Sequence, residues 1–208
     1  LGIIVAAIFV LLSQLTVMSL AGYVYPNVYG SAAAQSTASL LGTVVMLIVC
    51  APFASKLAAK FGKKELAVAS SICSALVWLV CLIWRPASVW GFVACYILAN
   101  IGMGFFNTII WAMITDVIDD AEVRSGIRED GTIYSVYSFA RKLGQAFSSG
   151  LVGALLGIIG YTEATAFDPA VTRGIFNMAC IAPIIGFVCI VLALVFLYPL
   201  NKKKVEEN

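Results

Sequence analysis

Long apolar stretches separated by short polar or turn-forming segments dominate the hydrophobic pattern of this chain. A helix needs about 20 apolar residues to cross a bilayer. Six stretches approach or exceed that length: 1–25, 36–57, 66–84, 89–115, 133–160 and 174–200. Backbone amides in hydrocarbon need internal partners, and the stretches lack the alternation of a transmembrane barrel. The pattern therefore predicts an all-α integral membrane protein with six transmembrane helices, joined by turns and by two longer loops, 116–131 and 161–173.

Composition supports a membrane protein and argues against several kinds of site. Hydrophobic residues make up 62% of the chain and charged residues 12%, whereas soluble domains carry about 25% charged residues. The six cysteines all fall in predicted spans without a C-x-x-C pair, which favours packing over disulfide or metal frameworks. Histidine, the commonest general base and metal ligand, is absent. We therefore expect no metal site, no cofactor and no nucleic-acid partner.

The basic residues predict the orientation of the spans. If the first span begins in the cytoplasm, the outer side receives only Arg85 and Arg173. The inner side then receives Lys56, Lys60, Lys63, Lys64, Arg124, Arg128, Arg141, Lys142, Lys202, Lys203 and Lys204. Because basic residues concentrate on the cytoplasmic side, we expect a multi-pass protein of the cell membrane with both ends of this chain in the cytoplasm. The apolar start at Leu1 and the charged tail 201–208 both read as cut points within a longer protein.

A polar stripe runs down one face of the fifth predicted helix. Its members recur at steps of three and four residues: Ser135, Ser138, Lys142, Gln145 and Ser149. Lys142 lies roughly 15 Å along the helix, near the middle of a ~30 Å hydrocarbon core. We interpret Lys142 as facing a water-lined cavity, with snorkelling to the interface as the alternative. Arg141 points about 100° away around the helix, and snorkelling explains it better.

Polar faces also mark three other spans. The fourth span carries Tyr96, Asn100, Gly104, Asn107 and Trp111; the second carries Ser36, Ser39, Thr43, Met46 and Cys50; the first carries Gln14, Met18, Ala21 and Tyr25. The third and sixth spans carry few polar residues by comparison. Each set of three consecutive spans therefore has two spans with a polar face followed by one without, which is the pattern of two inverted three-helix repeats around a shared cavity. Small residues late in the fifth span (Gly150, Gly153, Gly157 and Gly160) are expected to permit close helix packing.

Acidic residues gather in the predicted loop 116–131. Six of the eleven acids lie there together with Arg124 and Arg128: Asp116, Asp119, Asp120, Glu122, Glu129 and Asp130. The charges alone fit either a solvated loop or an ionic latch between helix ends that a conformational change opens and closes.

Two segments resemble a known family. The turn Lys60-Phe61-Gly62-Lys63-Lys64 resembles the basic turn of the major facilitator superfamily, with Ala59 where an aspartate is usual. Residues 116–161, DVIDDAEVRSGIREDGTIYSVYSFARKLGQAFSSGLVGALLGIIGY, resemble the signature of the glycoside–pentoside–hexuronide:cation symporters, the melibiose-carrier family. The matching positions are Asp116, Asp119, Glu122, Gly126, Arg128, Tyr134, Ser135, Phe139, Lys142 and Gly144.

The resemblance implies a twelve-helix transporter of which this chain is the C-terminal half. It implies that Lys142 lies in the central cavity and is needed for transport. It also implies that Asp116, Asp119 and Glu122, with Arg128, form cytoplasmic gate charges that close the inner side. Asp120 stands where the family often has an aromatic residue. The coupling cation, sodium or proton, is expected to bind mainly in the missing N-terminal half.

These observations lead to a hypothesis of sugar symport by alternating access, with the sugar between this bundle and the missing half. Lys142 would supply positive charge and hydrogen bonds, while Trp111 or Tyr25 would cover an apolar sugar face. The sugar hydroxyls would bind polar side chains of three spans: Gln14, Asn100, Asn107, Ser138 and Gln145. A lysophospholipid carrier of the same fold, a membrane channel or scaffold, and an intramembrane enzyme are the alternatives.

Overall fold

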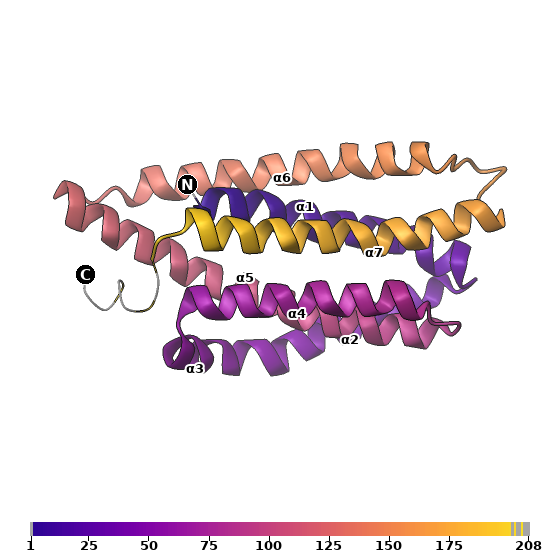
Figure 1. Cartoon of the computed structure of the whole chain (residues 1–208), viewed down its shortest axis with the longest axis horizontal. Coiled ribbons are helices and arrows are strands. Elements are labelled where there is room, and N and C mark those ends of the chain that lie inside the picture. Colours follow the sequence, from indigo (N-terminus) through magenta and orange to yellow (C-terminus); the bar gives the residue numbers. More distant parts are fainter. Residues whose placement is uncertain (1, 201, 203–204, 206–208) are drawn as a thin grey trace.

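The computed structural model describes residues 2–200, 202 and 205, which form an elongated bundle of helices that run along a common axis (Figure 1). No strand occurs among these residues, so the predicted all-α fold is confirmed. The elements in chain order are α1 (Gly2–Tyr23), η1 (Val24–Val28), α2 (Ala32–Val45), η2 (Met46–Cys50), α3 (Ala51–Phe61), α4 (Lys63–Trp84), α5 (Val89–Ser125), α6 (Asp130–Ile158), α7 (Pro169–Leu192) and η3 (Ala193–Leu197).

The helices form six rods: α1–η1, α2–η2–α3, α4, α5, α6 and α7–η3. Three of these rods contain a short π-helical segment. Each of η1, η2 and η3 is five residues long and continues directly from an α-helix. Pro26 lies within η1 and Pro52 follows η2, where the missing proline N–H forces the hydrogen-bond ladder to shift. The rods α1–η1, α2–η2–α3 and α7–η3 are therefore single spans with a local change of pitch.

The pairing of helices has an internal symmetry. Helix α1 packs along α6 and α7, α5 packs along α2 and α4, and α4 packs against α7. Exchange the first rod with the fourth, the second with the fifth and the third with the sixth. The α1–α6 pair then becomes the α5–α2 pair, and the α1–α7 pair becomes the α5–α4 pair. Successive rods run in opposite directions (Figure 1), so the related helices are inverted. This is the arrangement expected of two inverted three-helix repeats.

An aromatic cluster centred on Phe92 joins four rods. The ring of Phe92 lies 5.5 Å from that of Tyr25, 6.1 Å from Trp78 and 5.9 Å from Phe176. These separations are those of favourable aromatic pairs. Phe92 itself is 1% exposed. Since lipid gives little hydrophobic drive to helix association, such shape-dependent contacts hold the bundle together.

The fourth and fifth spans differ from the prediction in one boundary and in apolar content. The predicted loop from Asp116 is wrong over its first ten residues, because α5 continues as a helix to Ser125 and ends at Gly126 with φ 71°. An Arg124–Asp120 pair at i,i+4 spacing supports this extension. Five rods, within the described residues, are long and apolar enough to cross a membrane. Helix α6 is of similar length but is not among these five, because its polar stripe lowers its mean hydropathy.

Close approach between α1 and α6 depends on Gly144. A Cβ at this position would lie 2.6 Å from the backbone oxygen of Ile8, which is closer than real Cβ atoms approach. By contrast, a Cβ at Gly150, Gly153, Gly157 or Gly160 would meet nothing within 4 Å. The expectation that these four glycines provide close packing is therefore wrong in this chain. Gly160 instead takes a positive φ of 73° in the turn that ends α6.

Replacing Gly144 by valine should push α1 and α6 apart and lower the melting temperature of the full-length protein in detergent by about 3–10 °C. Gly150→Val is the matched control, because it adds the same side chain to the same helix in open space, and it should leave the melting temperature unchanged. Equal melting temperatures for the two variants would show that the α1–α6 approach does not depend on Gly144.

Candidate functional site

The polar stripe of α6 lies on the surface of this bundle. All five of its members are exposed: Ser135, Ser138, Lys142, Gln145 and Ser149. A second face of the helix is buried and includes Tyr137, Ala140 and Gly144, while a third is exposed and apolar and includes Phe139 and Phe147. Three distinct faces on one helix are suited to a position with neighbouring helices on one side, lipid on another and water on the third.

Lys142 is the charged group at the centre of this polar face. It is exposed, and it makes no hydrogen bond or ion pair with any residue in the described part of the chain. An ammonium group at the centre of a transmembrane helix costs about 2.5–3.5 kcal/mol on insertion scales. An uncompensated ammonium at this depth therefore needs water, a ligand or an acid from outside this bundle. Its place in a central cavity stays a prediction.

Arg141 is placed differently from the snorkelling position expected of it. Its guanidinium carbon lies 5.6 Å from the ring centre of Trp111 and 5.8 Å from that of Tyr137. One guanidinium N–H donates to the Tyr137 hydroxyl at 3.4 Å, while the two rings lie edge to face at 5.4 Å. Cation–π attraction therefore holds Arg141 at a contact between α5 and α6.

Three predicted amides lie close together between α1 and α5. The Asn107 side chain donates to the Gln14 side-chain oxygen at 3.4 Å, and Asn100 donates to the backbone oxygen of Tyr96 at 2.8 Å. Gln14 and Asn100 also line one cavity of about 70 Å³, with Ser13 beside them. The long Asn107 bond leaves donor and acceptor capacity that sugar hydroxyls can use.

Tyr25 does not share an exposed surface with these groups. Its side chain is 0% exposed and packs edge to face on Phe92, and its hydroxyl has no hydrogen-bond partner among the described residues. Trp111, the other predicted aromatic, is 47% exposed. Trp111 therefore remains available to a ligand in this conformation, whereas Tyr25 belongs to the aromatic core.

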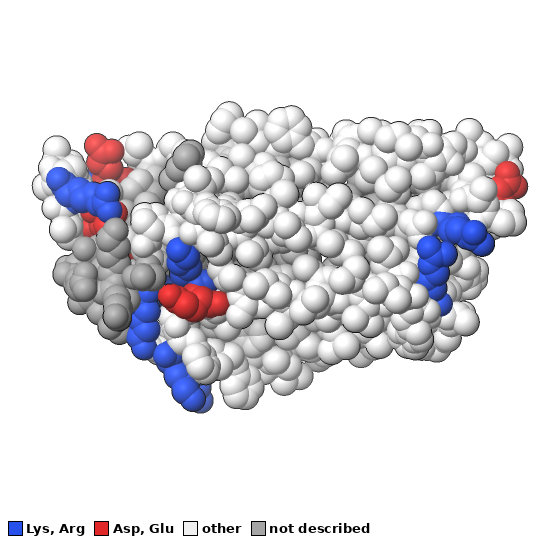
Figure 2. All heavy atoms as spheres, in the orientation of Figure 1, with Lys and Arg blue, Asp and Glu red and all other residues white. Residues whose placement is uncertain are grey.

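Charged side chains gather at the two ends of the bundle, as the face drawn in Figure 2 shows. At one end Arg128 connects α5 to α6 through three carboxylates. It donates to Glu122 at 2.7 Å, to Asp119 at 3.0 Å and to Asp130 at 3.0 Å. These hydrogen bonds, Glu122 foremost, raise the pKa of the Arg128 guanidinium above its usual value. All four residues are partly or largely exposed, so water competes for each contact.

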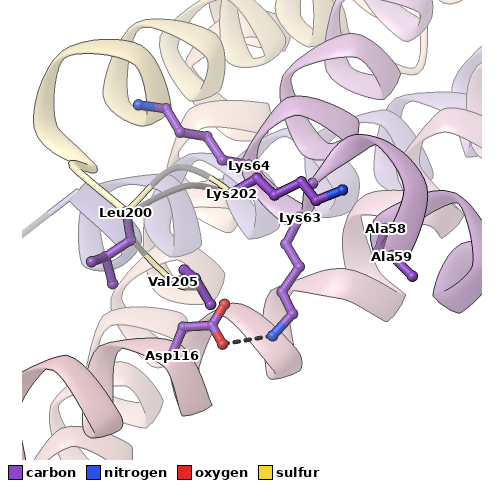
Figure 3. A pocket seen from close by; sticks show the side chains of 9 residues that line it. Ala58, Ala59, Lys63, Lys64, Asp116, Leu200, Lys202 and Val205 are labelled. Atoms are coloured by element: carbon purple, nitrogen blue, oxygen red, sulfur yellow. Dashed lines mark hydrogen bonds and ion pairs between the residues drawn. The ribbon is translucent and has the colours of Figure 1, made fainter. Parts of the chain in front are cut away.

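Asp116 belongs to a separate pair and not to the Arg128 group (Figure 3). Its side chain is 8% exposed and accepts from the Lys63 ammonium at 2.6 Å, which ties the start of α4 to α5. The second carboxylate oxygen is buried without a hydrogen-bond partner among the described residues. This pair lines a cavity of about 150 Å³ with Lys64 and Lys202. The basic turn 60–64 was visible in the sequence, but its acidic partner was not.

The same end is closed by contacts from the end of the last rod. Lys64 donates to the backbone oxygen of Tyr198 at 2.6 Å, and the Tyr198 hydroxyl donates to the backbone oxygen of Met113 at 3.3 Å. Together with the Lys63–Asp116 pair, these contacts join α4, α5 and the segment after η3. The predicted gate charges therefore divide into a buried tie at Asp116 and an exposed group around Arg128. Their role in gating stays a prediction.

Comparison with known proteins places this arrangement in a family. Residues 1–202 match the family model described as MFS/sugar transport protein, where MFS denotes the major facilitator superfamily. The glucuronide carrier protein homolog of Escherichia coli K12 is 30% identical over 81% of this chain and 36% of its own length. Two Bacillus subtilis proteins, the uncharacterized symporters YjmB and YnaJ, are 34% and 29% identical over 73% and 81% of this chain.

The match covers nearly all of this chain but a limited part of its relatives. The chain spans 36%, 33% and 36% of the length of the three relatives named above. Their names describe carriers and symporters, which are not enzymes, and transporters of this kind need no cofactor. With a family match over residues 1–202, an all-helical bundle and a lysine-bearing polar face on α6, this chain belongs to the MFS/sugar transport protein family.

Proposed function

We propose that this chain is the C-terminal six-helix half of a secondary active transporter that moves a sugar together with a cation. The sugar is a glycoside, pentoside or hexuronide, and the coupling ion is sodium or a proton. The observation that carries the proposal is Lys142, an exposed ammonium without a described partner, at the centre of a polar face on a transmembrane helix. A second bundle opposite this face would complete a water-lined site near the midplane.

Side chains on three helices supply the groups that a sugar site needs. Gln14 on α1, Asn107 on α5 and Gln145 on α6 offer amide donors and acceptors for hydroxyl groups, and Trp111 offers an apolar face of which 47% is exposed. Asn100 and Ser138 add further hydrogen-bonding groups. Binding sites for small molecules combine apolar walls with a few placed polar groups in this way.

Alternating access needs a closure at the cytoplasmic end that can open. The Arg128 group is suited to that role because its contacts are exposed and individually weak, so a rotation of the bundle can exchange them. The buried Lys63–Asp116 pair would keep the helices of this half together during the movement. In this proposal the ends bearing Lys63 and Arg128 face the cytoplasm, and the protein lies in the cell membrane.

The first test removes the ammonium of Lys142 in the full-length protein. Lys142→Ala should lower cation-driven sugar uptake by about 10- to 100-fold, since charge-assisted hydrogen bonds to the substrate or to coupling carboxylates are lost. Uptake is measured in proteoliposomes with a panel of radiolabelled glycosides, pentosides and hexuronides, while sodium and proton gradients are varied separately. Lysophospholipid is included as a further cargo, and its uptake without any sugar uptake would support the lipid-carrier alternative.

The matched control for this test is Lys56→Ala, which removes an exposed lysine on a different helix, α3. It should retain wild-type uptake, and both variants should insert into membranes normally. Normal uptake by Lys142→Ala would remove this lysine from the mechanism.

The second test addresses the gate. Asp119→Arg should repel Arg128 and shift the protein toward the inward-open state, by about two- to five-fold for an exposed ion pair. The shift is measured with a cysteine placed at Ser149 and modified by an impermeant maleimide from each side, after the exposed native Cys73 has been replaced. Glu163→Arg, an equal charge reversal at the opposite end of α6, should cause no shift. Equal accessibility in both variants would argue that the Arg128 group is only a solvated cluster.

A further inference from the structure

Arg141 has hydrogen-bonding capacity that this chain does not use. Its guanidinium carries five N–H donors, and within the described residues only the Tyr137 hydroxyl accepts from it, at 3.4 Å. No described acid forms an ion pair with Arg141, whereas the basic residues Lys63, Arg124 and Arg128, near the ends of α4 and α5, do form ion pairs. A guanidinium on a transmembrane helix with most donors unfilled indicates a partner from outside the bundle.

The surroundings of Arg141 hold the guanidinium in place and leave it reachable. The rings of Trp111 and Tyr137 flank it at 5.6 and 5.8 Å, and a guanidinium on aromatic faces keeps its donors free at its edge. Arg141 is half-buried, Trp111 is 47% exposed, and the next residue along α6 is the exposed Lys142. The group therefore borders the polar face proposed to bind sugar.

We propose that Arg141 binds the acid group of the transported sugar, so that the substrate class is anionic sugars such as hexuronides rather than neutral glycosides. The proposal rests on the sugar-transport function proposed above. A planar guanidinium forms two parallel hydrogen bonds with a carboxylate, a geometry that no lysine can reproduce. Arg141 would hold the acid group while the exposed ring of Trp111, 5.6 Å away, contacts the sugar ring, so the two neighbouring residues would bind adjacent parts of one ligand.

The test compares two ligands that differ only in the acid group: phenyl β-glucuronide and phenyl β-glucoside. The full-length wild-type protein in proteoliposomes should take up the glucuronide in preference to the glucoside. Arg141→Gln should lower the efficiency of glucuronide uptake by about 10- to 100-fold, as expected for loss of charge-assisted hydrogen bonds, and should leave glucoside uptake unchanged. Arg141→Lys should recover part of the glucuronide uptake, because it restores charge without the paired geometry.

The ratio of the two uptakes within one sample corrects for the amount of folded protein. Arg173→Gln, the same substitution at an exposed site near the start of α7, should retain the wild-type ratio. Should Arg141→Gln fail to fold, Arg141→Lys still has to lower the glucuronide-to-glucoside ratio. The glucuronide, but not the glucoside, should also raise the melting temperature of the wild-type protein, and by more than that of Arg141→Lys at the same ligand concentration.

Two results would overturn the role of Arg141 and leave sugar transport standing. They are a wild-type preference for the glucoside and an unchanged glucuronide-to-glucoside ratio in both Arg141 variants. An unchanged ratio that comes with an equal loss of both uptakes would indicate that Arg141 pairs with an acid of the protein and not with the ligand. Absence of any sugar uptake by the wild-type protein would instead reject the proposed function, and the proposed substrate class with it.

Discussion

The energetic cost of an ion inside hydrocarbon governs where this sequence can put its charges. Most basic and acidic side chains lie at the ends of the bundle, where they pair with one another or meet water (Figure 2). Arg141 and Lys142 depart from this distribution, because they occupy successive positions well inside α6, away from both of its ends. Such residues are usually compensated by a cavity, a ligand or a partner, and the proposed function therefore assigns its central groups to this part of α6.

The same cost explains which parts of the fold could be predicted from the sequence. Span length and apolar content are properties of one helix by itself, and they predicted six membrane helices, which correspond in order to the six rods of the bundle. The end of α5 could not be placed in this way, because helix formation continues beyond the apolar stretch into water. There the Asp120–Arg124 pair and the left-handed Gly126 decide the end of the helix. Hydrophobicity marks where a helix is in lipid, not where it stops.

Helix partners were harder to predict, because they depend on shape at single positions. Gly144 and Gly150 are the same residue on the same helix, yet a Cβ at the first would meet the Ile8 backbone and a Cβ at the second would meet nothing nearby. Tyr25 and Trp111 each lay on a predicted polar face, but Tyr25 is 0% exposed and Trp111 is 47% exposed. Spacing along one helix shows which residues share a face, but the neighbouring helix decides whether that face is open.

The charged groups of the candidate site show the same limit. The family resemblance grouped Asp116 with Asp119 and Glu122 as gate charges in a predicted loop, whereas all three lie on the last turns of α5. In the bundle Asp116 turns to Lys63 on α4, while Asp119 and Glu122 bind Arg128. The sequence predicted that Arg141 snorkels to the membrane interface. Its contact with Trp111 could not be predicted, because that contact depends on how α5 and α6 cross. Distances between helices, which the sequence does not contain, separate these roles.

Packing and function meet within four residues of α6. Gly144 lets the α6 backbone approach that of α1, and Arg141 and Lys142 lie less than one turn earlier on the same helix. Aromatic rings from two helices flank the guanidinium, whereas Lys142 is exposed and makes no hydrogen bond or ion pair within the described part of the chain. A rigid group suits recognition of one ligand geometry, and a mobile charge suits a step in which the partner changes. Under the proposed function, these two adjacent cations would divide the work: Arg141, held by the rings, would bind the substrate, and Lys142 would serve the coupling step.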